Sequence, residues 1–449
     1  MLYWWDKSRQ GGLDMRQNHR AGRGQARHGG RRRAGAGVTR RGFLLGAGAA
    51  ALGAAGLWLR GCVRPDGGGA SPGPAAPAAG EWRAAWISYI ELQGMDYTSA
   101  EAFRAGAEAM MDNCAALGLN TVIVQVRPFG DALYPSALFP WSHICTGTQG
   151  VSPGFDPLDL LLTAAHGRGL SFEGWINPYR LRASAASPGA LAADNLANTH
   201  PEWVAAVGDG LYLNPALPEA AAYVVDGVAE LVRNYPVDGV HFDDYFYPTT
   251  DPAIDAAPFA ASGAADLAGW RRQNVTALVK AAHDAVKAAD PTLRFGVSPQ
   301  GNPDNDMEQQ YSDVYGWLAA DGGEAVVDYL CPQIYWGQGY TLSNGSLRFA
   351  FENIVPEWLA MPRGSAALYV GLGAYRIGDG DGGANPDSVA GWSTGRALAD
   401  QVASLRAAGA GGYALYRYGS LFQNDAWPQL TEAERAALTA ANAAAGPSA

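Results

Sequence analysis

From about residue 81 onward, short apolar runs alternate with longer segments of helical periodicity. The runs are rich in β-branched and aromatic residues, and apolar positions in the segments between them recur every three or four residues. We predict strands over 84–88, 121–126, 170–176, 239–243, 294–298, 327–334, 367–372 and 412–416. Helices are predicted over 98–117, 158–168, 219–234, 264–289, 308–318, 347–359, 394–407 and 425–443.

These segments form eight successive strand–helix units. Continuous apolar strands separated by helices indicate a parallel sheet that is buried on both faces. The pattern therefore predicts an α/β fold, a (β/α)₈ TIM barrel with long βα loops, over residues 81–445. A doubly wound sheet is the alternative, although no G-x-G-x-x-G motif opens a helix after the first strand.

The first 80 residues differ in composition from the barrel segment. Arg40 and Arg41 precede an uncharged Gly/Ala-rich run that ends at Leu59, which is typical of a twin-arginine export signal. We therefore predict a signal region over 1–61 that is handled by the twin-arginine translocase. A weakly hydrophobic membrane anchor is the alternative. The sequence Leu59-Arg60-Gly61-Cys62 resembles a lipoprotein cleavage box, so Cys62 is a candidate lipid anchor.

Residues 62–80 are dominated by Pro, Gly and Ala, which predicts a tether that cannot bury a core. We expect residues 1–80 to be disordered and not to fold with the barrel. The exported protein would then reside in the periplasm, the cell envelope or the extracellular space.

Charge is distributed very unevenly along the chain. Residues 1–61 hold 12 basic and 2 acidic residues, which leaves 20 basic and 41 acidic residues in 62–449. Such an acidic body repels phosphate backbones, so nucleic acid is not an expected partner. Four cysteines without a C-x-x-C pair support neither a disulfide framework nor a zinc finger, and no cofactor is predicted.

The predicted strands end in polar and aromatic residues. Active sites of TIM barrels lie at the carboxyl ends of the strands, and sugar-binding clefts combine hydrogen-bonding groups with flat aromatic surfaces. This predicts a polysaccharide-binding cleft. Its candidate substrate-binding residues are Gln125, Arg127, Asp131, Trp175, Asn177, Tyr179, Arg180, His241, Tyr245, Tyr247, Ser298, Gln333, Trp336 and Tyr416.

Asp243 and Asp244 follow the fourth strand directly. Like charges in a shared site push one pKa upward, so the pair is a candidate for catalysis. His241 and Asp243 would share one face if the strand persists. The aspartates could instead only pin the loop, or could bind a metal together with His241. A Ser/His/Asp hydrolase is disfavoured because the chain has no G-x-S-x-G elbow.

Long motifs follow one another along the predicted barrel. They are Arg127–Ser136, Pro140–Ser142, Thr146–Gly150, Phe155–Leu158, Ala165–Gly169, Trp175–Arg180, Tyr212–Pro215, Asp238–Pro248, Trp270–Asn274 and Pro332–Trp336. These motifs resemble the glycosyl hydrolase-like family 10, a family of exported bacterial barrel proteins that includes a hydrolase of peptidoglycan glycan strands. The resemblance runs from about residue 82 to 425 and implies a TIM barrel that hydrolyses glycosides in the cell envelope, with Asn274 added to the substrate-binding set.

A weaker likeness links Asp238-x-x-His241-x-Asp243-Asp244 and Tyr335 to the D-x-x-D-x-D-x-E strand and strand-6 tyrosine of chitinases. This chain lacks the final Glu, so we predict Asp243, Asp244 and Tyr335 as catalytic residues, with the N-acetyl group of the substrate as the nucleophile. The remaining candidates for a second carboxylate are Glu91, Asp131 and Glu173. The predicted substrate is an N-acetylated glycan strand of peptidoglycan. The alternatives are a non-catalytic glycan-binding barrel and a metal-dependent polysaccharide deacetylase.

Overall fold

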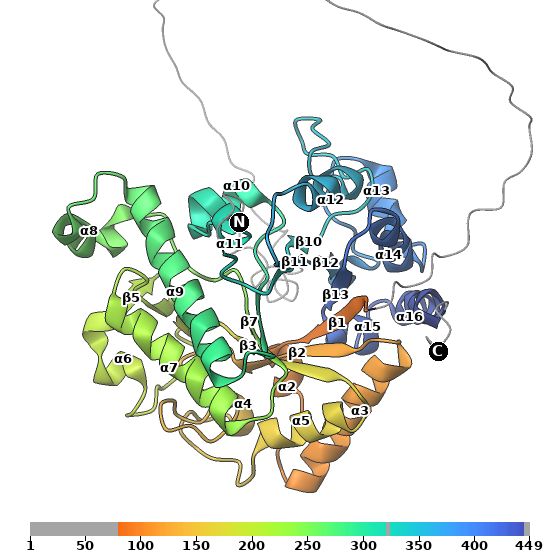
Figure 1. Ribbon diagram of the computed structural model, residues 1–449. Helices are drawn as coiled ribbons and strands as arrows, with labels where there is room; N and C mark the ends of the chain where they lie inside the picture. The colour runs from red at the N-terminus through yellow and green to blue at the C-terminus, as the bar shows by residue number, and fades with distance from the viewer. Residues whose placement is uncertain (1–79, 320–323, 444–449) are drawn as a thin grey trace, which may run out of the picture. The chain divides into compact units, whose positions relative to one another are not determined.

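The computed structural model describes residues 80–319 and 324–443 (Figure 1). The predicted signal region, the candidate lipid anchor Cys62 and the tether up to residue 79 lie outside these residues. Within the described part of the chain, no helix is both long enough and apolar enough to cross a membrane.

Parallel strands form the centre of the fold, and all eight predicted strands are present. The first five are β1 (Trp82–Ile87), β2 (Thr121–Arg127), β3 (Ser171–Ile176), β7 (Gly239–Phe242) and β8 (Arg294–Val297). The last three are β9 (Tyr329–Leu330) with β10 (Gln333–Ile334), β11 (Ala367–Leu368) with β12 (Val370–Gly373), and β13 (Gly412–Tyr416).

The sheet closes into a barrel. β13 pairs with β1, and the two strands at the ends of the sheet, β10 and β11, adjoin β9 and β12 along the chain. β8 pairs with β9 and β9 with β11, whereas β10 pairs with β12 and β12 with β13. Pro332, which has no N–H to donate, separates β9 from β10. The hydrogen bonds continue past it, from Gln333 N to Pro299 O and from Gly371 N to Pro332 O, both 2.9 Å. The predicted TIM barrel is confirmed.

Helices surround the barrel on the outside (Figure 1). Seven of the eight predicted helices are found: α3 (Ala100–Ala116), α5 (Pro157–His166), α7 (Pro218–Asn234), α9 (Leu267–Ala289), α12 (Phe351–Leu359), α14 (Ala397–Ala407) and α16 (Pro428–Ala443).

The continuous helix predicted over 308–318 is wrong. The chain instead forms the π-helix η4 (Asp306–Gln310) and, after a break, the short helix α11 (Val314–Trp317). Tyr311 adopts a left-handed conformation with φ of 56°, which ends the first element. The Asp313 side chain then accepts a hydrogen bond from Gly316 N and starts the second.

The long loops carry short elements that the periodicity did not predict. Strands β4 (Arg180–Arg182), β6 (Gly210–Leu213) and β5 (Val204–Val207) form an antiparallel sheet between β3 and α7. The remaining elements are α2 (Tyr89–Gln93), α4 (His143–Thr146), α6 (Leu196–Thr199), η2 (Pro201–Trp203), η3 (Pro252–Ile254), α8 (Ala256–Ser262), α10 (Pro303–Asn305), η5 (Ala374–Arg376), α13 (Pro386–Gly391) and α15 (Tyr418–Phe422).

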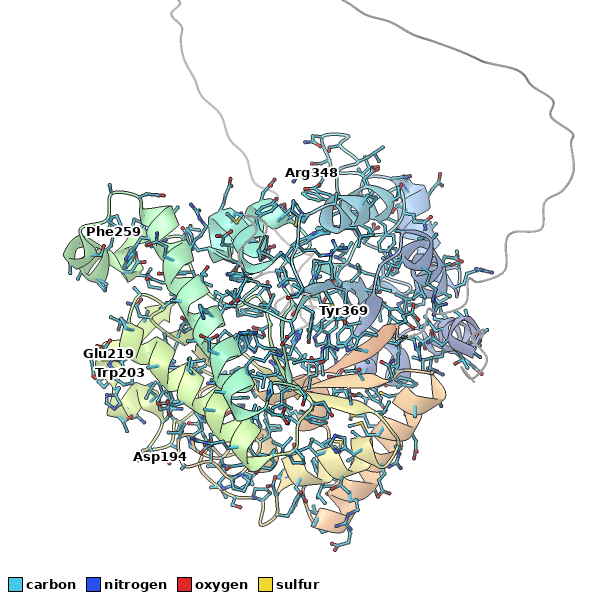
Figure 2. All side chains as sticks on the ribbon, viewed as in Figure 1. Asp194, Trp203, Glu219, Phe259, Arg348 and Tyr369 are labelled. Carbon is cyan, nitrogen blue, oxygen red and sulfur yellow. The ribbon has the colours of Figure 1, made fainter. Side chains whose placement is uncertain are left out.

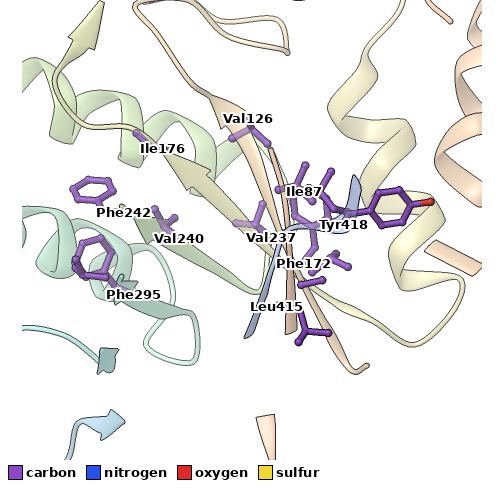
Figure 3. Close-up of a cluster of buried hydrophobic side chains, with 14 of the residues drawn as sticks. Ile87, Val126, Phe172, Ile176, Val237, Val240, Phe242, Phe295, Leu415 and Tyr418 are labelled. Atoms are coloured by element: carbon purple, nitrogen blue, oxygen red, sulfur yellow. The ribbon is translucent and has the colours of Figure 1, made fainter. Parts of the chain in front are cut away.

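Two sets of buried side chains hold the barrel together, because residues alternate between its inner and outer faces. Phe172, Val240, Phe242 and Phe295 belong to the cluster between strands and helices, part of which is drawn in Figure 3. A second cluster fills the interior of the barrel with large rings. Its buried members are Trp82, Ala84, Trp86, Ile123, Trp175, Tyr329, Cys331 and Ala414.

Candidate active site

Asp243 and Asp244 lie at the carboxyl end of β7, where that strand has already ended at Phe242. Both side chains are 3% exposed. Because the strand does not persist, the condition under which His241 and Asp243 would share a strand face is not met. The two aspartates therefore belong to the βα loop at the catalytic end of the barrel.

Asp243 is held by donors from β3 and the loop that follows it. Its Oδ2 accepts hydrogen bonds from Trp175 Nε1 at 2.9 Å and from Asn177 Nδ2 at 3.1 Å. Its Oδ1 accepts only a longer bond of 3.3 Å from Tyr245 N. Burial and the neighbouring charge of Asp244 raise the pKa of Asp243 to about 7, although Arg180 and the Trp175 bond oppose the shift. Near neutral pH this carboxyl group can both hold and release a proton.

Asp244 is held by a side chain from β10 and not from β3. Its Oδ1 accepts a hydrogen bond of 3.0 Å from Gln333 Nε2, and the same amide group donates to Ser298 O at 3.0 Å. Burial raises the pKa of Asp244, while the hydrogen bond from Gln333 lowers it. Of the two aspartates, Asp243 is thus the one whose pKa is raised by its neighbour's charge.

Tyr335 and Tyr416 form an aromatic wall next to this pair. Their rings stack with centroids 5.4 Å apart, and Tyr375 packs edge-on against Tyr335 at 5.5 Å. The pKa of Tyr335 is raised well above its usual value, mainly by burial and in smaller part by the tyrosines around it and Asp244. Tyr335 therefore keeps its hydroxyl proton and can act as a hydrogen-bond donor near the carboxylates.

A second aromatic group lies beyond Tyr335 along the chain. The Trp336 ring stacks on Phe349 with centroids 4.9 Å apart and meets Tyr340 at 5.9 Å. Arg348, labelled beside α12 in Figure 2, forms ion pairs with Asp304 and Glu357. These ion pairs fix the loop that carries Phe349, and with it one face of Trp336.

Arg180 connects Asp243 with the loops on the β2 side. Its guanidinium lies 4.9 Å from the ring centre of Tyr245 and 4.8 Å from that of Phe129, and its Nε donates to Pro128 O at 3.2 Å. The Arg180 backbone N–H donates to Asn177 Oδ1 at 3.0 Å. This bond orients the Asn177 amide so that its NH₂ group faces Asp243.

His241 is fully buried in the barrel interior. Its Nε2 lies 3.3 Å from Trp86 Nε1 and 2.9 Å from Ser298 Oγ, and its Nδ1 lies 2.7 Å from the Tyr329 hydroxyl. An indole N–H can only donate, so Nε2 accepts and the proton of the neutral ring sits on Nδ1. Burial lowers the pKa of His241 to about 3, so the ring is neutral at ordinary pH.

Glu173 continues this interior chain of hydrogen bonds. It accepts from the Tyr329 hydroxyl, and its Oε1 lies 3.7 Å from Arg294 Nη1 at the start of β8. Burial raises the pKa of Glu173 to about 7. The observed contacts of His241 and Ser298 are with other protein groups inside the barrel, and their contact with substrate stays a prediction.

Of five further predicted binding residues, four are buried and the fifth, Asn274, is partly exposed. Gln125 accepts from Tyr89 N, Tyr179 has no exposed surface, and Arg127 lies 4.7 Å from the ring centre of Phe139. Tyr247 is 2% exposed and receives a 3.5 Å bond from Asn274 Nδ2 on α9. Their contact with substrate stays a prediction. The structure gathers the other candidates, apart from Asp131, His241 and Ser298, around Asp243, Asp244 and the two aromatic groups.

The three other candidate carboxylates are engaged elsewhere. Glu91 accepts from Ser88 N and Gly419 N and pairs with Arg417. Asp131 is bonded to His143 and Gln149, and Glu173 lies inside the barrel.

A further buried carboxyl group, Asp306, is not among the site residues predicted from the sequence. It has no exposed surface and accepts from Gln300 N at 2.9 Å. Burial raises its pKa well above the usual value, and the charge of Asp244 adds to the shift. The motif Asn302-Pro303-Asp304 signals a helix start in this loop, but no pattern singles out Asp306.

Metal binding can be assessed for the described residues. Across 80–319 and 324–443, no group of three or more His, Cys, Asp or Glu side chains is placed to hold a metal ion.

Comparison with known proteins identifies the family. The profile of Glycosyl hydrolase-like 10 matches residues 81–382. Glycosyl hydrolase YngK of Bacillus subtilis (strain 168) is 35% identical over 325 residues, which cover 66% of this chain and 61% of that protein. Glycosyl hydrolase DigH of Escherichia coli (strain K12) is 34% identical over 299 residues, covering 60% of this chain and 65% of that one. The chain thus matches less than two thirds of the length of these relatives.

Among solved structures, the glycoside hydrolase domain of PgaB (BpsB) from Bordetella bronchiseptica superposes with a TM-score of 0.51 at 15% identity. The match covers 80% of this chain and 99% of that domain, and it bears on the fold alone. The family predicted from the sequence motifs is confirmed. This chain belongs to the Glycosyl hydrolase-like 10 family.

Proposed function

We propose that this protein hydrolyses glycosidic bonds in N-acetylated glycan strands, with peptidoglycan as the substrate. The observation that carries the proposal is the buried Asp243–Asp244 pair beside the Tyr335–Tyr416 wall. Two carboxyl groups so close together do not both ionise cheaply, so one holds a proton while the other carries the charge. Stacked tyrosines supply a flat surface for a sugar ring.

Asp243 is the proton donor in this scheme. Its Oδ2 is occupied by Trp175 and Asn177, which leaves Oδ1 to carry the proton that passes to the leaving-group oxygen. Asp244 remains ionised, held by Gln333, and stabilises the positive charge that develops at the reacting sugar. Tyr335 donates a hydrogen bond to the acetamide of the substrate.

The acetamide oxygen of the substrate acts as the nucleophile. It attacks the anomeric carbon as the leaving group departs with the Asp243 proton, and a cyclic oxazolinium ion forms, whose positive charge the ionised Asp244 balances. Water then opens this ring and returns a proton to Asp243. The scheme suits a site in which Glu91, Asp131 and Glu173 are all committed to protein partners.

Asp243→Asn tests the proposal, because it keeps the shape of the side chain and removes its acidity. We expect reducing-end release from purified, denuded glycan strands to fall by roughly two to four orders of magnitude. Asp251→Asn is the matched control, since Asp251 is an exposed carboxylate in the same loop whose bond to Ala253 N an amide can keep. Equal activity of wild type and Asp243→Asn would refute the assignment. Release of acetate from the N-acetyl groups without chain cleavage would identify a deacetylase instead.

The site of action follows from the amino-terminal sequence. Arg40 and Arg41 stand before an uncharged run, which supports export by the twin-arginine translocase to the compartment that holds the cell wall. Replacing both arginines by lysine should leave the protein in the cytoplasm of a host with this translocase. Continued export of the double variant would contradict the proposed route, and mass spectrometry of mature Cys62 would test the lipid anchor.

A further inference from the structure

A serine, a histidine and an aspartate form a hydrogen-bonded row in a part of the molecule that the proposed glycosidase does not use. Asp131 follows β2, His143 is the first residue of α4, and Ser187 lies between β4 and α6. His143 Nδ1 lies 3.0 Å from Asp131 Oδ2, and His143 Nε2 lies 3.3 Å from Ser187 Oγ. The two ring nitrogens therefore connect a carboxylate on one side with a hydroxyl on the other.

The surrounding hydrogen bonds determine where the protons lie. Gln149 Oε1 accepts from Ala192 N at 2.9 Å, so the Gln149 NH₂ group is the one that donates to Asp131 Oδ2 at 2.8 Å. Asp131 thus acts as an acceptor, and His143 donates to it through Nδ1–H. The neutral ring then offers the lone pair of Nε2 to the Ser187 hydroxyl, as a general base for a serine nucleophile requires.

Exposure to solvent increases along the row from Asp131 to Ser187, so that the acid is buried and the nucleophile is accessible to a substrate. Asp131 has no exposed surface, His143 is 8% exposed, and Ser187 is exposed. Pro188, the next residue, is buried and anchors the loop. The backbone N–H groups of Gly189 and Ala190 make no hydrogen bond to other described residues, so they can serve an oxyanion.

We propose that Ser187, His143 and Asp131 form a catalytic triad that hydrolyses carboxylic esters with a small acyl group. Ser187 Oγ attacks the acyl carbon while its proton passes to His143 Nε2, and the same proton then leaves with the departing alcohol. Water then attacks the acyl-serine and gives a proton to His143, which passes it to Ser187 Oγ as the carboxylic acid is released. The net reaction is ester plus water to alcohol plus carboxylic acid.

The position of the triad indicates the carrier of the ester. The His143 and Phe129 rings have centroids 5.5 Å apart, and Phe129 also packs under Arg180, which contacts Tyr245 beside Asp243. This chain of contacts leads from Asp243 to His143, so the substrate class is an O-acyl ester on a sugar of the glycan bound at Asp243. This choice of carrier rests on the proposed function, whereas the esterase chemistry does not.

The first test uses no glycan. A fluorophosphonate probe should label wild-type protein at Ser187, and p-nitrophenyl acetate should be hydrolysed. Ser187→Ala should abolish labelling and lower the esterase rate at least 100-fold. Ser184→Ala is the matched control, because Ser184 is a nearby serine in the same loop for which no bond to a histidine is found among the described residues, and it should behave as wild type.

Ser187 is exposed, so its truncation should leave the unfolding midpoint and glycan cleavage unchanged. Absence of labelling in the wild type, or equal labelling of wild type and Ser187→Ala, would overturn the triad. Release of acetate from an O-acetylated glycan by wild type, but not by Ser187→Ala, would support the sugar ester. Probe labelling without such release would refute the glycan as carrier and leave the triad intact.

Discussion

Loss of the buried ion pair between Asp255 and Arg271 should destabilise the loop that follows β7. Neither side chain has exposed surface, and Arg271 makes two bonds to the carboxylate, of 2.8 and 2.6 Å. Its three other N–H bonds go to Thr250 O, Asp251 O and the Tyr311 hydroxyl. Asp255→Ala would leave a guanidinium without its counter-charge in a dry environment, which typically costs about 3–5 kcal/mol.

Chemical denaturation of the purified protein measures this cost from the shift in midpoint at constant m-value. Asp400→Ala is the control, because it removes an exposed pair with Arg396 that contributes roughly 0.5 kcal/mol or less. The double variant Asp255→Ala/Arg271→Met should be more stable than the sum of the two single changes predicts. A cost of Asp255→Ala no larger than that of the control would refute the reasoning.

Three further predictions concern protonation. Because the pKa of Asp243 is raised to about 7 and the proton donor must be protonated, kcat/KM should fall as pH rises through about 7, and a flat profile there would contradict the role. Trp175→Phe removes a bond that lowers this pKa, so the alkaline limb should move to higher pH, whereas a downward shift would argue against the contact. Burial raises the pKa of Glu173 from 4.5 to about 7, so its contribution to stability is complete below pH 4.5 and lost through pH 7. At 1.36 kcal/mol per pH unit this is about 3 kcal/mol, and Glu173→Gln should flatten the decline in a denaturation series from pH 5 to 8.

The sequence was most informative about the strands. Alternation of inner and outer residues is strong in strands such as β7, where Val240 and Phe242 pack outward and His241 points into the barrel. Apolar burial dominates there, and its period is visible in the residue pattern. The division of the sixth strand at Pro332 could have been anticipated, since proline cannot donate to a ladder.

Loop conformations and hydrogen-bond networks could be predicted less well from the sequence, because they depend on contacts between residues far apart along the chain. The helix over 308–318 failed at Tyr311, whose left-handed conformation no local pattern predicts. Asp243 and Asp244 were correctly placed at a strand end, yet the partners that distinguish them come from β3 and β10. The Ser187–His143–Asp131 row joins the loop after β2, the start of α4 and the loop between β4 and α6, and it follows no sequence motif for a serine hydrolase.

The most direct test of the proposed mechanism compares two oligosaccharides that differ only at the reacting sugar, one N-acetylated and the other with a free amine. Because the acetamide supplies the nucleophile in the proposed mechanism, kcat/KM should be at least 1,000-fold lower for the free amine, on the order of the loss expected when an essential catalytic group is removed. Equal cleavage of the two substrates, or a covalent sugar ester trapped on an aspartate or glutamate, would contradict substrate-assisted hydrolysis by Asp243, Asp244 and Tyr335.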